Sequence, residues 1–128
     1  MPQSDTPPPL HELEAEIMEE VWRLGEATVH DVRDALNGRS PKERAYTTVM
    51  TVMGRLHNKG MLERERRGRS DVYLARLDRE QYLDARARSQ VTALVEEYGD
   101  IALAHFAAQV EGLDAKRRKK LQRMARGG

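Results

Sequence analysis

Three threonines and one arginine lie close together in this sequence, and their side chains are well suited to hydrogen bonding with a polyanion. Thr47, Thr48 and Thr51 offer hydroxyls, and Arg55 follows them with a guanidinium. Such groups can bond to phosphate oxygens and to the exposed edges of nucleic-acid bases. No carboxylate occurs between residues 45 and 60, although a surface helix usually carries Glu and Lys. The segment is therefore predicted to approach a nucleic acid closely.

A helix over residues 45–59 would hold these four side chains on one face. Apolar residues recur at three- and four-residue steps on the opposite face, as expected for a helix packed on a core. They are Val49, Val52, Met53 and Leu56. Gly60 supplies a stop, and two short strands are predicted over 61–67 and 71–77, joined by the turn 68–70. A helix followed by a hairpin with a basic tip is typical of a winged helix-turn-helix.

Two helices are predicted upstream, after a disordered, proline-rich leader over residues 1–9. The first, over 10–24, combines a buried apolar stripe with a solvated acidic face. The stripe is Leu13, Ile17, Val21 and Leu24, and the acidic residues are Glu12, Glu16, Glu19 and Glu20. The second helix opens with a capping box of Thr28 and Asp31, turns Val29, Val32 and Leu36 inward, and ends at Asn37–Gly38. Residues 10–77 are thus predicted to form a mainly α, winged-helix DNA-binding domain with three helices and a two- to three-stranded wing.

Residues 78–128 are predicted to form a helical dimerisation region. A long helix to about Tyr98 is followed by a short apolar helix and by a final basic helix. These helices have no obvious way to close a core alone, so we expect them to pair with a second copy of the chain. The predicted dimerisation residues are Leu83, Val91, Leu94, Val95, Ile101, Leu103, Phe106, Val110 and Leu121.

The net charge of +1 conceals strong segregation of charge along the chain. Residues 1–38 hold two basic and nine acidic residues, whereas residues 39–69 hold nine basic and three acidic residues. Residues 70–113 are acidic again, with four basic and eight acidic residues. Residues 114–128 hold seven basic residues and one acidic residue. Positive charge is therefore concentrated on the predicted third helix and wing, as DNA binding favours.

The composition excludes several other classes of function. The 128 residues include no cysteine, so disulfides and thiolate metal sites are excluded. The four histidines are scattered, and no Gly-rich phosphate loop or Ser/His/Asp cluster is present, so we expect neither an enzyme, a metal nor a cofactor. The sequence has no apolar run near the length of about eighteen residues that spans a membrane, and no signal peptide at its start. A cytoplasmic location is expected.

Several of these features together resemble a known family. Tyr46-Thr-Thr-Val-Met-Thr51, Arg55-Leu56, Lys59-Gly60, the basic wing and the pattern Leu13 to Trp22 are similar to the penicillinase-repressor family, which includes the BlaI, MecI and CopY types. The resemblance covers roughly residues 10–126 and is most specific over 10–76. It implies a dimeric winged-helix repressor of transcription that binds a palindromic double-stranded DNA operator. The DNA contacts that follow are Tyr46, Thr47, Thr48, Met50, Thr51, Arg55, Arg66, Arg67 and Arg69.

This sequence departs from the family pattern at three places. Met50 stands where a polar residue is common, and its apolar side chain would suit contact with a thymine methyl group. Copper-responsive members carry a cysteine-rich tail, which is missing here. Antibiotic-responsive members are cleaved by a regulatory protease at an Asn-Phe bond in the dimerisation region, where this chain has His105-Phe106.

The same residues also admit less specific interpretations. Thr47, Thr48 and Thr51 could form an ordinary polar face, because threonine readily bonds back to its own helix. The run Lys116–Lys120 fits either a solvated helix end or a second contact with phosphates. The rival function is a winged-helix module that binds an acidic protein rather than DNA. Such a surface needs exposed anchors, for which only Tyr46 and Met50 are candidates.

Overall fold

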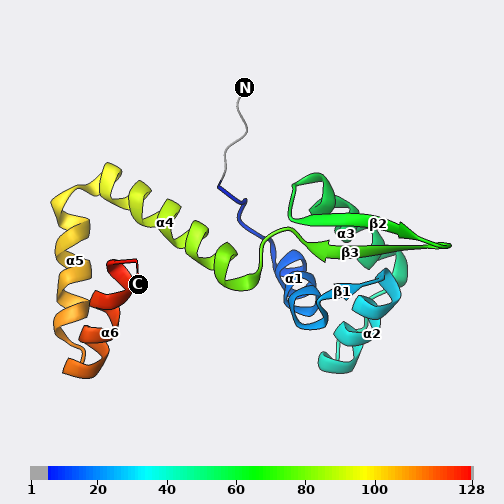
Figure 1. Ribbon diagram of the computed structural model, residues 1–128, viewed down its shortest axis with the longest axis horizontal. Coiled ribbons are helices and arrows are strands. Elements are labelled where there is room, and N and C mark those ends of the chain that lie inside the picture. Colours follow the sequence, from blue (N-terminus) through cyan, green and yellow to red (C-terminus); the bar gives the residue numbers. More distant parts are fainter. Residues whose placement is uncertain (1–5, 128) are drawn as a thin grey trace. The chain divides into compact units, whose positions relative to one another are not determined.

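The computed structural model describes residues 6–127, which fall into two compact units. The first unit extends to Ala87 and the second begins at Arg88, so the division lies within a helix rather than at residues 77 and 78. In chain order, the elements are α1 (Glu12–Leu24), β1 (Glu26–Ala27), α2 (Val29–Arg39), α3 (Tyr46–Asn58), β2 (Leu62–Arg67), β3 (Ser70–Ala75), α4 (Arg79–Tyr98), α5 (Asp100–Glu111) and α6 (Ala115–Ala125) (Figure 1).

The first unit is a three-helix domain with a small antiparallel sheet, which confirms the predicted winged-helix class. The strand order is β1-β3-β2, so the third strand of the wing is the two-residue β1 that connects α1 to α2. Arg67 pairs with Ser70 across a two-residue turn, in which Gly68 has a φ of 63°. A positive φ at the first turn residue alone fits a type II′ hairpin, which follows the twist of the strands. The tip of this hairpin projects beyond the helices of the unit (Figure 1).

The three helices meet in one apolar core. Val49, Val52, Met53 and Leu56 of α3 are all buried, as the helical spacing predicted. They pack with Ile17, Met18 and Val21 of α1, Val29, Val32 and Leu36 of α2, and Leu62 and Tyr73 of the sheet. Burial of this stripe fixes which face of α3 is left to the solvent.

Helix α2 and its connection to α3 are held by local hydrogen bonds. The predicted capping box is confirmed, because Asp31 N donates to the Thr28 hydroxyl and Thr28 N donates to the Asp31 carboxylate. The helix continues to Arg39, past the end predicted at Asn37–Gly38. The Asn37 side chain then bonds to both backbone groups of Arg44, at 2.7 Å to its N and 3.2 Å to its O. These bonds fix the connection just before α3 begins.

Helix α1 differs from the prediction at two residues. Leu24, predicted to be buried, is 45% exposed at the last position of the helix, where Gly25 turns the chain toward β1 with a φ of 85°. Glu20, predicted to lie on a solvated face, is only 3% exposed. Its carboxylate pairs with Arg23 and with Arg39 of α2, the latter at 3.0 Å. A partner distant in the sequence therefore satisfies the buried charge.

A second buried carboxylate joins α1 to the end of α3. Glu14 is 1% exposed and accepts hydrogen bonds from the backbone N of His11 at 2.9 Å and from Lys59 Nζ at 2.8 Å. Burial alone would raise its pKa, but Lys59 and the His11 N–H outweigh burial and hold the pKa below its ordinary value. This ion pair ties the C-terminal end of α3 to the start of α1.

The segment before α1 packs against the start of α4. Pro7 is buried, and its carbonyl accepts a hydrogen bond from Arg86 at 3.3 Å, while the Pro8 carbonyl accepts one from the Tyr82 hydroxyl at 3.0 Å. The prediction of a disordered leader over residues 1–9 is therefore wrong for Pro7 and Pro8. Residues 1–5 lie outside the described part of the chain. These contacts explain why the first unit continues into α4 as far as Ala87.

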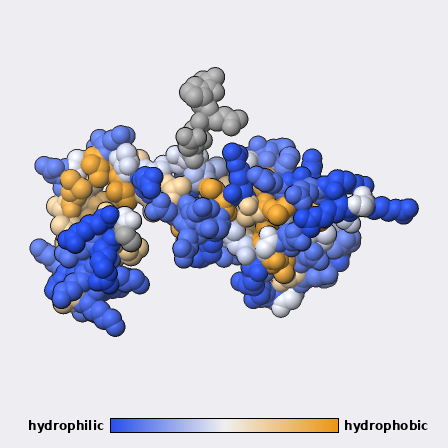
Figure 2. Space-filling model, viewed as in Figure 1, coloured by the Kyte–Doolittle hydropathy of each residue, from blue (hydrophilic) through white to orange (hydrophobic). Residues whose placement is uncertain are grey.

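The second unit has no core of its own. Among the described residues 88–127, no side chain is buried. Apolar surface gathers where α4 ends and α5 begins (Figure 2). Of the predicted dimerisation residues in this unit, Val95 and Leu121 are half-buried, and the exposed ones are Val91, Leu94, Ile101, Leu103, Phe106 and Val110. Leu83 is exposed as well but belongs to the first unit.

Candidate nucleic-acid interface

The solvent-facing side of α3 carries five of the predicted DNA contacts. Thr47, Thr48, Met50, Thr51 and Arg55 are all exposed, opposite the buried stripe of the same helix. Within the described chain, none of the three threonine hydroxyls makes a hydrogen bond. The alternative interpretation, in which these hydroxyls bond back to the backbone of α3, is therefore wrong. The hydroxyls are therefore available to an external partner. We call Thr47, Thr48, Met50, Thr51 and Arg55 the reading face.

Tyr46 is positioned differently from the reading face. It is half-buried, and its ring lies 4.5 Å from the ring of His30 on α2 with a tilt of 34°. The Arg33 guanidinium lies 5.9 Å from the centre of the Tyr46 ring, within the range of a cation–π contact. Tyr46 thus anchors the first turn of α3 to α2, and little of its ring remains for an external contact.

The register of the hairpin divides the predicted wing residues between its two faces. Leu62, Arg64 and Arg66 alternate along β2 on one face of the sheet, and Tyr73, which pairs with Arg64, shares that face. Because Leu62 and Tyr73 are both buried, this is the face that packs on the core. Arg67 belongs to the opposite face, together with Glu26 of β1 and Glu65 of β2. Arg69 occupies the turn itself. The arginines predicted to act together therefore point in different directions.

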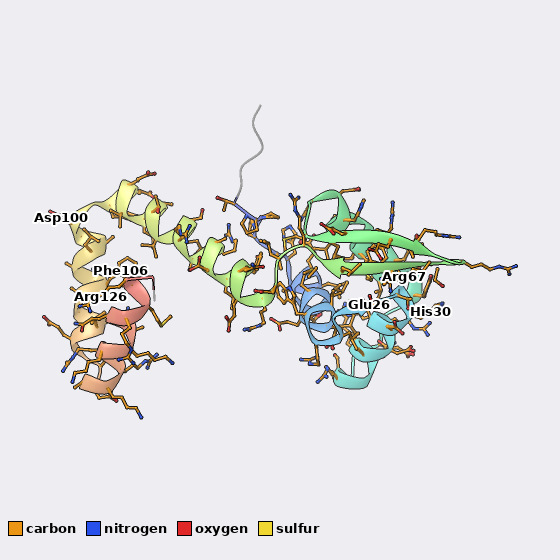
Figure 3. The ribbon with its side chains drawn as sticks, in the orientation of Figure 1. Glu26, His30, Arg67, Asp100, Phe106 and Arg126 are labelled. Carbon is orange, nitrogen blue, oxygen red and sulfur yellow. The ribbon has the colours of Figure 1, made fainter. Side chains whose placement is uncertain are left out.

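Arg67 is neutralised within the chain. It pairs with Glu26 of β1 and with Glu65 of β2, each at 2.8 Å, and Figure 3 labels Arg67 and Glu26. The two carboxylates raise the pKa of Arg67 further, and Arg67 in turn lowers the pKa of Glu26. Because two negative charges surround it, Arg67 adds less positive potential at the wing than its formal charge indicates.

Other cations of the basic segment 39–69 are paired in the same way. Ion pairs with carboxylates of the described chain occupy Arg39, Arg44, Lys59, Arg66 and Arg67. The cations of this segment that make no side-chain hydrogen bond or ion pair there are Lys42, Arg55, Arg64 and Arg69. Fewer cations of this segment are therefore available to DNA than the sequence indicated, and the available ones are these four side chains.

Arg64 and Lys42 were not among the predicted contacts. The signal for Arg64 was present, since it alternates with the buried Leu62 and so had to share the core-facing side of β2. Lys42 gave no comparable signal, because the connector 40–45 has no periodicity from which to infer exposure. Lys42 precedes the reading face in the sequence and Arg64 follows it, so each adds an unpaired positive charge to the candidate interface.

The structure offers little support for other kinds of site. Within residues 6–127, no group of three or more histidine, aspartate or glutamate side chains is arranged to hold a metal ion. None of the helices described is both long and apolar enough to cross a membrane. The candidate site is therefore the reading face of α3, together with the unpaired cations Lys42, Arg64 and Arg69. A helix of this kind beside a β-hairpin defines the chain as a winged-helix protein of the DNA-binding class.

The family follows from comparison with known proteins. The model of the penicillinase repressor family matches residues 10–126. The chain is 36% identical over 114 residues to the transcriptional regulator BlaI of Mycobacterium tuberculosis, a match that covers 85% of this chain and 80% of that protein. The chain belongs to the penicillinase repressor family, which confirms the resemblance seen in its sequence. It is accordingly a DNA-binding transcriptional repressor and not an enzyme.

Solved structures agree with this assignment. The DNA-binding domain of the repressor BlaI superposes with a TM-score of 0.52 at 26% identity, covering 62% of this chain and 94% of that domain. The monomeric form of Bacillus licheniformis BlaI, solved in complex with the blaP half-operator, superposes with a TM-score of 0.50 at 28% identity. That match covers 59% of this chain and 90% of the other.

Proposed function

We propose that the chain represses transcription as a homodimer that binds a two-fold symmetric operator in double-stranded DNA. In each half-site, α3 enters the major groove with its reading face and the β2–β3 hairpin lies along the backbone. One observation carries the proposal: α3 exposes free hydroxyls and the unpaired Arg55 on a surface without a carboxylate. The Bacillus licheniformis BlaI complex with a half-operator supports it, because a related domain binds DNA there.

The reading face divides into residues that specify bases and residues that hold phosphates. Thr47, Thr48 and Thr51 are placed to hydrogen-bond to base edges, and Met50 to contact a thymine methyl group. Arg55 neutralises a phosphate or bonds to a base, and Arg69 at the hairpin turn neutralises the backbone beside the groove. Contacts with phosphates set affinity and register, whereas contacts with base edges set the preferred sequence.

The remaining predicted contacts have supporting roles in this proposal. Arg66, paired with Asp71 at 3.3 Å, can exchange that exposed partner for a phosphate. Arg67 would have to leave two carboxylates at once, so it contributes least of the wing arginines. Tyr46 acts through the position of α3, because its ring is held against His30 and Arg33.

The helices beyond Ala87 supply the dimer in this proposal. Residues 88–127 expose Val91, Leu94, Ile101 and Phe106 and bury no side chain among themselves. A soluble monomer seldom leaves so continuous an apolar surface uncovered, and a second copy offers a matching one. A two-fold dimer would place its two α3 helices in major-groove segments about one helical turn apart, or a multiple of that distance.

Control of the repressor and its place in the cell are also proposals. The bond between His105 and Phe106 lies in the middle of α5, so a protease that acts there must first unfold part of that helix. Cleavage would remove apolar residues that the dimer needs, which would release the operator. A repressor of this kind works in the cytoplasm, where the DNA of a bacterial cell lies.

The test starts from an unbiased choice of DNA. The full chain selects duplexes from a random pool, and fluorescence anisotropy then measures its affinity for the selected sequence and for a scrambled one. We expect tight, sequence-dependent binding that Arg55→Ala weakens at least tenfold. The matched control Arg79→Ala removes a cation from the start of α4, where Arg79 pairs with the exposed side chain of Glu19, and should leave affinity nearly unchanged. Equal binding of both duplexes, or equal losses in both variants, would contradict the proposal.

The rival, a module that binds an acidic protein, loses one of its two anchors. Tyr46 is half-buried against α2, so only Met50 remains as an exposed apolar side chain on α3. Protein interfaces rely on several large apolar anchors at their centre. A chain that selected no duplex at low salt would favour this rival.

A further inference from the structure

Gly54 interrupts the exposed side of α3. It lies within the helix, three residues after Thr51 and seven after Thr47, so these three positions form one line along the solvent-facing surface. Glycine is an unfavourable residue inside a helix, because it loses more backbone freedom than alanine and offers no side chain to pack. A glycine beside Thr51 and Arg55 of the reading face is therefore unexpected.

The chain itself provides no such explanation. Gly54 does not have a positive φ, so its backbone conformation is open to any residue. A Cβ atom built on Gly54 would meet no other atom within 4 Å. Neither strain nor packing within the described chain therefore requires a glycine there. The reason for a glycine at this position must therefore lie outside the described chain.

We propose that Gly54 is where the backbone of α3 approaches double-stranded DNA most closely, and that its missing side chain sets how deeply the helix enters the groove. The inference rests on the proposed function. Met50 and Thr51 lie one turn before Gly54, and Arg55 follows it, so the gap is bordered by the groups assigned to bases and phosphates. Because α3 carries no carboxylate, nothing on this surface repels a close polyanion.

A methyl group at this position would act as a spacer. It would hold α3 away from the duplex by an amount on the order of 1 Å, and hydrogen bonds weaken steeply once donor and acceptor separate beyond about 3.2 Å. Contacts by Thr47, Thr51 and Arg55 would then weaken together, although none of these residues had changed.

Gly38 provides a matched control. It is the last residue but one of α2, it has no positive φ, and a Cβ atom built on it also meets nothing within 4 Å. The full-length Gly54→Ala and Gly38→Ala chains are compared in thermal unfolding and in anisotropy with the duplex that the wild-type chain selects. Both variants should unfold at a higher temperature than the wild type, because each gains helix propensity: Gly54→Ala by roughly 2–5 °C, and Gly38→Ala, next to the end of its helix, by less. Only Gly54→Ala should bind the duplex more weakly, by about tenfold or more.

The combination of higher stability with weaker binding is the diagnostic result. If Gly54→Ala bound the selected duplex as tightly as the wild type, the inference alone would be overturned and the proposed function would stand. If Gly54→Ala lowered the unfolding temperature while Gly38→Ala raised it, glycine would serve packing, which also overturns the inference. A wild-type chain that bound no duplex at all would overturn both.

Discussion

Replacement of Lys59 by methionine should destabilise the winged-helix unit strongly at neutral pH. Glu14 is buried, and Lys59, with its Nζ at 2.8 Å, is the only ion-pair partner that Glu14 has among the described residues. Lys59→Met keeps most of the aliphatic stem but leaves the carboxylate with the His11 N–H alone. Removing one member of a buried ion pair costs roughly 3–5 kcal/mol. Because the Lys59 side chain is 29% exposed, we expect the lower part of that range or slightly less, about 2–3 kcal/mol.

The pH dependence distinguishes this cause from a simple loss of packing. In the wild type, the folded-state pKa of Glu14 is lowered, so its contribution is present above the ordinary pKa of 4.5 and is lost as pH falls through the folded value. In Lys59→Met, burial acts without Lys59 and raises that pKa. Protonation then relieves the buried charge as the pH falls. The stability difference between the two chains should therefore shrink from pH 7 toward pH 5 and below.

Urea unfolding followed by circular dichroism at several pH values measures this difference. The double variant Glu14→Gln, Lys59→Met should recover much of the stability lost at pH 7, because no buried charge remains. Arg79→Met, which breaks an exposed pair with Glu19, is the control and should cost at most about 1 kcal/mol. A Lys59→Met chain as stable as the wild type at pH 7, or a deficit that is constant with pH, would refute the reasoning.

Three further predictions concern the wing, the dimer and the anchoring of α3. Arg69→Ala should lower the slope of log affinity against log salt by about one unit in anisotropy titrations. Arg67→Ala should lower that slope less, because Arg67 is already paired with two carboxylates. Equal changes in slope would contradict the assignment of Arg69 as the main phosphate contact of the wing. Leu94→Glu and Phe106→Glu should each yield monomers in sedimentation velocity, and a persistent dimer would exclude these residues from the interface. Tyr46→Ala should weaken DNA binding severalfold with little change in salt slope, whereas an unchanged affinity would argue against anchoring by Tyr46.

Local patterns were enough to predict the framework of the winged-helix unit. The spacing of Val49, Val52 and Leu56 determined which side of α3 is buried, because a helix repeats every 3.6 residues. Thr28 and Asp31 marked the start of α2 through bonds between residues three apart. Each of these signals depends only on residues that are close together along the chain. A single sequence is therefore enough to detect them.

Interactions between distant residues could not be predicted in the same way. Glu20 looks like part of a solvated acidic face until Arg39, on another helix, is placed beside it. Formal charge likewise gave Arg67 and Arg69 equal weight, although Glu26 of β1 neutralises only Arg67. Strand β1 has two residues, too few to show an alternating pattern. These features depend on tertiary structure, which brings together residues that no sequence window contains.

Chemical-shift mapping tests most directly whether α3 and the hairpin form the DNA-binding surface. Backbone amide shifts of the ¹⁵N-labelled full chain are recorded at low salt, with and without a duplex selected by the wild-type protein. We predict that the largest changes lie between Thr47 and Arg55 and at the hairpin turn around Arg69, with small changes in α1. Changes confined to residues 88–127, or a spectrum unaffected by the duplex, would contradict the account.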